Sequence, residues 1–282
     1  MDYSSVFRFR RIFVGCLLIL GLPASACAQW SMGARSVAMA QAHSAIPVDL
    51  WAVFHNPAAL HPKKAGLGFF AIRYYGLREL EDHAVTFSYP LKWLFASKNV
   101  SATLAAGIHT YGFDLYRRTQ SRVGMALHFD RFSIGFTANY AHLQIKGYGS
   151  RGSPLFDAGI IAKISKHFRV GYRLTNVFNA GNKGAGADIH PAEMSGGISW
   201  NATAGVLITA DVVKDLLHPV TLRTSTEISL PGGLYLRGGW TSLPFTWSAG
   251  AGIRIYRFSG NFAVQRHEVL GLSPGIDVQL VL

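Results

Sequence analysis

The sequence predicts an all-β protein: a transmembrane antiparallel β-barrel of about fourteen strands with an N-terminal plug segment. Apolar residues make up 49% of the chain and charged residues only 15%, below the roughly 25% typical of soluble domains. After residue 22, no apolar run approaches the roughly 18 residues that a membrane helix needs. Apolar residues instead alternate with small or polar ones from about residue 65 onward. Since lipid admits only helices and closed barrels, this alternation predicts a single barrel.

Residues 1–28 are expected to be a cleaved secretory signal peptide. A basic region with three arginines precedes a short apolar run and then small residues around Ala28. A lipoprotein start at Cys27 remains an alternative. Cys16 and Cys27 are the two cysteines of the sequence, so a processed chain would have no disulfide and no thiol chemistry. Export through such a signal predicts a bacterial outer-membrane location.

Residues 29–64 are expected to form the plug, and residues 65–282 the transmembrane barrel. Within the plug, residues 33–60 read GARSVAMAQAHSAIPVDLWAVFHNPAAL. The many small residues permit close packing inside a narrow lumen. Asn56 before Pro57 favours a turn that ends the segment ahead of the first strand.

The expected strands follow a period of two residues. The alternation is clearest in residues 168–175, 247–255 and 276–282. Short turns, such as 130–131 and 256–257, are expected at one end of the barrel. At the other end, longer links are expected at 76–82, 110–119, 146–154, 179–192, 214–219, 241–246 and 266–273. This asymmetry is typical of outer-membrane barrels, whose termini and short turns face the periplasm.

The same alternation directs a set of charged side chains into the lumen. One interpretation is an anion-preferring channel. The other is a set of structural partners for the plug, including Asp49, and for one another. The expected inward residues are Arg122, His128, Arg169, Arg173, Arg223, Glu227, Arg237, Arg254 and Asp277.

The net charge of +12 raises the question of a nucleic-acid partner. No basic cluster is interleaved with aromatic residues, so no nucleic-acid binding is expected. The eleven histidines show no His-x-His or His-x3-His pairing with acidic neighbours, so neither a metal site nor a cofactor is expected.

No catalytic residue is assigned from the sequence. His128 and His142 could each pair with a serine on a neighbouring strand, but a barrel offers such pairs by chance, and no G-x-S-x-G motif is present. The glycine-rich stretch 181–186 lacks a strand–helix context and is interpreted as a loop, not as a phosphate-binding motif. The chain is therefore not expected to be an enzyme.

Residues 33–60 resemble the N-terminal signature of the PorV/PorQ outer-membrane proteins, within the FadL-like barrel superfamily. Weaker similarity extends to residues 111–117, 176–179, 236–240 and 267–272. The matching signature residues are Gly33, Arg35, Ser36, Met39, Ala42, Ala45, Asp49, Ala52, Asn56, Pro57, Ala58 and Leu60.

The resemblance implies a PorV/PorQ-like accessory or scaffold barrel that serves protein export or surface attachment. The alternatives are a FadL-like passive conduit for small hydrophobic compounds and, from another class, an outer-membrane lipolytic enzyme. The polar, glycine-rich character of residues 179–192 favours the accessory role over an apolar capture groove. The expected partners are outer-membrane lipid and lipopolysaccharide, the barrel-assembly machinery and components of a secretion system.

Overall fold

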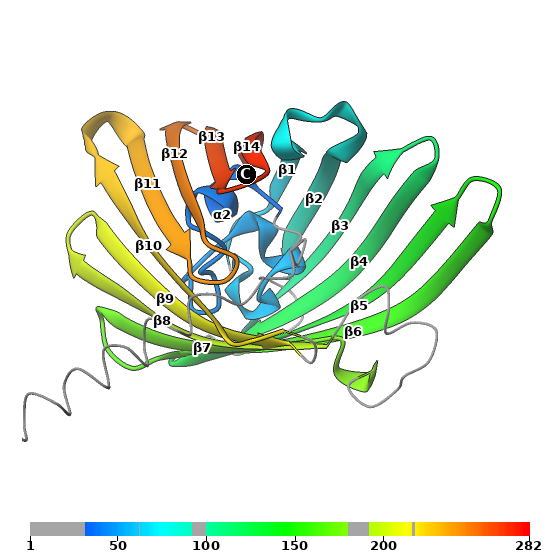
Figure 1. Cartoon of the computed structure of the whole chain (residues 1–282). Coiled ribbons are helices and arrows are strands. Elements are labelled where there is room, and N and C mark those ends of the chain that lie inside the picture. Colours follow the sequence, from blue (N-terminus) through cyan, green and yellow to red (C-terminus); the bar gives the residue numbers. More distant parts are fainter. Residues whose placement is uncertain (1–31, 62, 92–99, 180–191, 216–217) are drawn as a thin grey trace, which may run out of the picture.

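The computed structural model of the chain describes residues 32–61, 63–91, 100–179, 192–215 and 218–282. The expected signal peptide and the glycine-rich stretch 181–186 lie outside these residues. Figure 1 shows strands that surround the N-terminal part of the described chain, which is drawn in blue.

The strands form one closed barrel in which sequence neighbours pair in order and β14 pairs with β1. The expectation of a fourteen-stranded antiparallel barrel is confirmed. Closure runs from the pair Gly66↔Val281 to the pair Ile72↔Gly275. The strands are β1 (Gly66–Arg73), β2 (Glu81–Leu91), β3 (Ser101–Phe113), β4 (Tyr116–His128), β5 (Phe132–Ile145), β6 (Gly149–Lys163), β7 (Phe168–Thr175), β8 (Glu193–Thr203), β9 (Val206–Asp215), β10 (Thr221–Leu230), β11 (Leu234–Thr241), β12 (Thr246–Ile255), β13 (Phe258–His267) and β14 (Gly271–Val281).

Alternate residues face opposite sides of the wall, as the pleat requires. Large apolar side chains point outward, and several are more than half exposed: Phe69, Val123, Phe136 and Ile276. Asp82, Thr103, Asp157 and Asp277 point inward and are buried. An apolar outer surface over a polar inner one is the arrangement of a barrel that faces lipid.

The two ends of the barrel differ. At the short-turn end, where β1 starts and β14 ends, tight connections include 204–205 and 256–257. At the opposite end, which we call the hairpin end, the expectation of long links at 110–119 and 146–154 is wrong. β3 and β4 are joined by only residues 114–115, and β5 and β6 by only 146–148. Their polar and aromatic residues continue the ladders as hairpins, because a hairpin beyond the lumen can carry polar side chains on both faces.

Strand β7 ends at Thr175, where the alternation of residues 168–175 also ends. Asn176 has a φ of 55°, in the left-handed region, so the extended backbone cannot continue through it. A short 3-10 helix, η6 (Val177–Asn179), follows. Three more short 3-10 helices lie in connections: η4 (Tyr74–Gly76), η5 (Arg78–Leu80) and η7 (Pro231–Gly233).

Residues 32–61, which we call the inner segment, lie inside the barrel. The segment contains helix α2 (Ala34–Ala38) and the 3-10 helices η2 (Leu50–Phe54) and η3 (Pro57–Ala59). Helix α2 packs on β11 to β14, whereas η2 and η3 pack on β1 to β6 (Figure 1). Most residues of the segment are buried, and Trp51 is completely so. Among the described helices, none is long and apolar enough to cross a membrane.

Candidate functional site: the inner segment in the lumen

The inner segment is a chain of short helices, each begun by a residue suited to that position. Gly33 precedes α2 with a φ of 88°, and a side chain there would overlap the ring of Trp51. Asp49 starts η2, and its Oδ1 accepts a hydrogen bond from the Trp51 backbone N–H at 3.2 Å. Asn56 starts η3 in the same way: its Oδ1 accepts from the Ala58 N–H at 3.1 Å. These caps hold the segment in one folded path.

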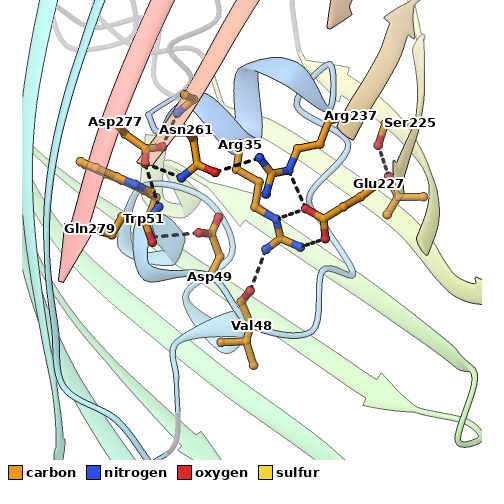
Figure 2. A network of polar contacts seen from close by, with 12 residues as sticks. Arg35, Val48, Asp49, Trp51, Ser225, Glu227, Arg237, Asn261, Asp277 and Gln279 are labelled. Atoms are coloured by element: carbon orange, nitrogen blue, oxygen red, sulfur yellow. Dashed lines mark hydrogen bonds and ion pairs between the residues drawn. The ribbon is translucent and has the colours of Figure 1, made fainter. Parts of the chain in front are cut away.

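Figure 2 shows how the segment is tied to strands β10 to β14. The Arg35 guanidinium donates through Nε and Nη2 to the two carboxylate oxygens of Glu227, each at 2.8 Å. Its Nη1 donates to the Val48 carbonyl oxygen at 2.9 Å. Arg35 therefore clamps the segment to itself and to β10 at once. A bidentate charge-assisted pair of this kind is among the strongest polar contacts in proteins.

The hydrogen-bonded network continues along the inner side of the barrel wall and leads back to the inner segment. Glu227 also accepts from Arg237 Nε at 2.6 Å, and Arg237 Nη1 donates to Asn261 Oδ1 at 2.9 Å. Asn261 Nδ2 donates to Asp277 Oδ1 at 2.7 Å. The Ala34 N–H at the start of α2 then donates to Asp277 Oδ2, also at 2.7 Å.

Burial changes the acid–base properties of the segment. Burial acts to lower the pKa of Arg35, but Glu227 more than offsets it and raises that pKa above its usual value. Burial raises the pKa of Asp49 to about 6, against the opposing charge of Arg35. Although Asp49 was expected to pair with wall arginines, its carboxylate caps η2, and among the described wall arginines none forms an ion pair with it.

A second polar contact joins the segment to strands β4 to β6. Arg122 Nη1 donates to Asp157 Oδ2 at 3.0 Å and lies 3.4 Å from the carbonyl oxygens of Val53 and Phe54. Asn139 donates to the same Asp157 oxygen at 2.8 Å. Asp157 and Asn139 were not expected from the sequence. Both occupy inward positions of the strand alternation, so that pattern could have identified them.

Two further contacts hold the bend at residues 43–46. The Ser44 N–H donates to Asp211 Oδ2 at 2.8 Å, and the Ser44 carbonyl oxygen accepts from Asn56 Nδ2 at 2.6 Å. Gly171 of β7 lies so close that a Cβ there would stand 1.9 Å from that oxygen. Asp211 is another inward carboxylate that the sequence analysis missed.

The opposite side of the segment is apolar. Trp51 contacts Phe70 of β1 with ring centroids 5.8 Å apart and Phe54 with centroids 6.0 Å apart. Phe54 meets the ring of His109 edge-on at 5.8 Å. Ile72, Ala84 and Ala105 belong to the same buried cluster, and Tyr74 packs against it. The β1–β3 side of the lumen, which we call the apolar half, holds this cluster together with the hydrogen-bonded Asp82 and His109. The β10–β14 side, which we call the charged half, holds the network of Arg35 and Glu227.

The structure places the other expected residues as follows. Arg173 pairs with Glu193, and Arg223 Nη1 donates to the Gln41 carbonyl oxygen at 3.3 Å. Arg169 is partly buried, while Arg254 is exposed. In the inner segment, Ser36 is buried, Met39 clusters with Ile46 and Leu207, and Pro57 and Ala58 lie against Gly135.

The two histidines considered for catalysis have different surroundings. His128 Nδ1 lies 3.0 Å from Ser133 Oγ, and its Nε2 lies 3.3 Å from Thr103 Oγ1. Over the described part of the chain, no carboxylate contacts the His128 ring and no serine is hydrogen-bonded to His142. Neither site combines a nucleophile, a base and an orienting carboxylate. In the same described residues, no group of three or more potential metal ligands gathers.

A cavity of about 430 Å³ opens at the short-turn end, between the inner segment, strands β10 to β14 and the adjoining ends of β1 and β2. The described chain provides the following lining residues: Arg35, Val48, Asp49, Leu50, His61, Lys64, Ala65, Gly66, Ser88, Glu227, Tyr235, Arg237, Ile253, Arg254, Tyr256, Arg257, Ser259, Asn261, Gln279, Val281 and Leu282.

No protein-family model matches the sequence, and no curated protein sequence matches it either. Solved structures do match. The CymD monoaromatic hydrocarbon channel superposes with a TM-score of 0.64 at 12% identity, covering 91% of this chain and 99% of that one. The toluene transporter TodX of Pseudomonas putida gives 0.57 at 12% identity, with 92% and 98% covered. A Pseudomonas aeruginosa FadL homologue gives 0.57 at 13% identity, with 91% and 99% covered.

At this level of identity the comparison shows the fold. The chain has the barrel fold of the FadL-like hydrocarbon channels along most of its length. The PorV/PorQ branch is not among these similar structures, so the finer part of the sequence resemblance stays a prediction.

Proposed function

We propose that this chain is a bacterial outer-membrane channel for small hydrophobic compounds. One observation carries the proposal: a closed barrel of the hydrocarbon-channel fold holds an inner segment whose apolar side faces an apolar half of the lumen. The outward apolar surface supports placement in a lipid bilayer. From the sequence, the channel was the alternative to the accessory role. The similar structures support the channel better than the accessory role.

In this proposal the inner segment closes the lumen to polar solutes. Trp51 and Phe54 occupy the centre with exposed fractions of 0% and 5%, and the barrel wall surrounds them. A hydrophobic solute would pass along the β1–β3 side, where Phe70, Ile72 and Tyr74 offer an apolar surface. Water and ions gain nothing there, because an apolar surface cannot replace their hydrogen bonds.

The test is uptake by a Gram-negative host that lacks its own hydrocarbon channels. We expect labelled toluene to enter cells that express this chain several-fold faster than cells with an empty vector, while glucose uptake is unchanged. Deletion of residues 33–60 should admit glucose as well. Equal toluene uptake with and without the chain, at a surface amount verified by heat-modifiable gel mobility, would refute the channel.

The accessory or scaffold role stays a second candidate because of the hairpin end. Every connection at that end exposes a large apolar residue in its described part. Such residues suit contact with another protein better than contact with water. They are Leu77, Leu115, Tyr148, Phe178, Val220, Leu243, Phe245, Val269 and Leu270.

Crosslinking in intact cells distinguishes the two candidates. A photoreactive amino acid at Tyr148, which is 91% exposed, should yield a defined adduct with an envelope or secreted protein if the chain is a scaffold. The same amino acid at Tyr256 on the short-turn end, which is 98% exposed, is the matched control. Absence of any adduct specific to Tyr148 would leave only the channel.

A further inference from the structure

We propose that the cavity at the short-turn end binds a small organic anion through Arg254 and its neighbouring cations. Phe70, Ile72 and Tyr74, along which the channel proposal places the solute, do not line this cavity. Its ligand class is also different, because the ligand carries a carboxylate or phosphate group.

The described lining of the cavity carries more positive than negative charge. Among the described residues, its lining contains the five basic side chains of Arg35, Lys64, Arg237, Arg254 and Arg257 and the two acidic side chains of Asp49 and Glu227. A concave wall of one sign concentrates its field in the cavity and attracts ions of the opposite sign.

The two acidic side chains that line the cavity already have partners within the protein. Glu227 accepts from both Arg35 and Arg237, so one negative charge serves two guanidinium groups. Asp49 caps η2 through the Trp51 N–H. Among the described residues, no carboxylate forms an ion pair with Arg254, Arg257 or Lys64. Within the described residues, the positive charge at the mouth of the cavity is therefore not paired with a carboxylate.

Arg254 lies beside the ring of Tyr235 at the cavity. Its guanidinium carbon lies 5.3 Å from the centre of the Tyr235 ring, and that of Arg237 lies 5.2 Å from the same ring. The Tyr235 ring thus contacts two guanidinium groups at the cavity, and of these Arg237 is paired with Glu227. Guanidinium groups bind carboxylate and phosphate through two parallel hydrogen bonds, which a single ammonium group cannot match.

The cavity also has apolar lining residues that could contact an uncharged part of the ligand. Val48, Leu50 and Val281 also line the cavity and provide an apolar surface beside the cations. A volume of about 430 Å³ lies within the range of small-molecule sites. The site therefore fits an anion with a compact apolar body, such as a ring that bears one carboxylate or phosphate group.

The test measures binding to the purified full chain in lipid nanodiscs by calorimetry. The probes are phenyl phosphate and benzoate, with benzyl alcohol as the uncharged control. We expect at least one anion to bind while benzyl alcohol does not, and added salt should weaken the binding. Binding of phenyl phosphate alone would assign a phosphate site, and comparable binding of both anions a general carboxylate or phosphate site.

Variants locate the binding. Arg254→Gln should weaken the Kd of the better anion about tenfold, and Arg254→Lys should recover part of the loss. Arg131→Gln is the matched control, since it removes the same charge from an exposed turn at the same end but outside the cavity. Binding of neither anion, equal binding of benzyl alcohol, or an equal loss in the Arg131 variant would overturn the proposal. Because no transport is measured, failure of the channel proposal leaves this result unaffected.

Discussion

The two halves of the lumen hold the inner segment by different physical means. On the β1–β3 side, Trp51, Phe54 and Phe70 exclude water and stabilise by apolar burial and ring contacts. On the β10–β14 side, Arg35, Glu227 and Asp277 stabilise by a continuous hydrogen-bonded network. The apolar contact tolerates sliding but loses energy with every void, whereas the polar network demands one position. The apolar half thus provides most of the binding energy, and the charged half fixes the orientation.

The largest effect is expected in the apolar half, for Trp51→Ala. Removing this fully buried indole leaves a void beside Phe54 and Phe70, which costs about 3–5 kcal/mol. The free energy of local opening of residues 33–60, measured by hydrogen–deuterium exchange, should fall by that amount. Trp240→Ala is the control because Trp240 is 40% exposed on the outer face of β11, and residues 33–60 should remain protected. Unchanged protection in the Trp51 variant would contradict the division of roles.

A smaller loss is expected in the charged half, for Glu227→Gln. The variant leaves Arg35 and Arg237 next to each other without their shared carboxylate. Loss of one partner of a buried pair costs up to about 3–5 kcal/mol, but this pair retains some solvent contact, so we expect about 2–3 kcal/mol. Exchange should increase first around Ala34, at the start of α2.

The matched control for this variant is Glu81→Gln, which breaks the exposed Arg73–Glu81 pair on the outer surface. No change in the exchange of residues 33–60 is expected there, because solvent screens that pair. If both variants open the segment equally, the effect reflects general charge and not the network, and the charged half has no special role in orientation.

The difference between the halves also explains what the sequence could predict. The wall has a period of two residues, so the strands and the inward direction of Arg122 and Arg237 follow from local pattern. The partner of Arg35 does not, because Glu227 lies 192 residues away and meets it only when the barrel closes. The role of Asp49 was similarly out of reach, since its cap depends on the helix start at Leu50. The expected lengths of the links 110–119 and 146–154 were wrong because polar residues that continue the β-ladder were interpreted as loops.

The smallest effect, and the sharpest test of the balance, is the dependence of the segment on pH. His43 and His55 of the inner segment stack with ring centroids 4.1 Å apart. Burial lowers the pKa of His55 to about 3 and also lowers that of His43, with the nearby charge of Arg173 acting in the same direction on both. A histidine that is neutral when buried favours the inner segment in its packed position, which we call the seated segment, at pH values above the ordinary histidine pKa of about 6.5. This contribution to stability is lost as the pH falls below that value.

Asp49 acts in the opposite direction. Because burial raises its pKa to about 6, its protonated form favours the seated segment, and this contribution is lost as the pH rises through 6. Two histidines oppose one carboxylate, so the opening constant of residues 33–60, corrected for intrinsic exchange, should rise about thirtyfold between pH 6.5 and pH 5. The double variant His43→Gln/His55→Gln should reverse the slope and leave only the Asp49 contribution, whereas Asp49→Asn should make the loss at low pH steeper. A flat profile in the unmodified chain would mean that neither buried group is coupled to the seating of the segment, and the stacked pair would then be only a packing contact within the inner segment.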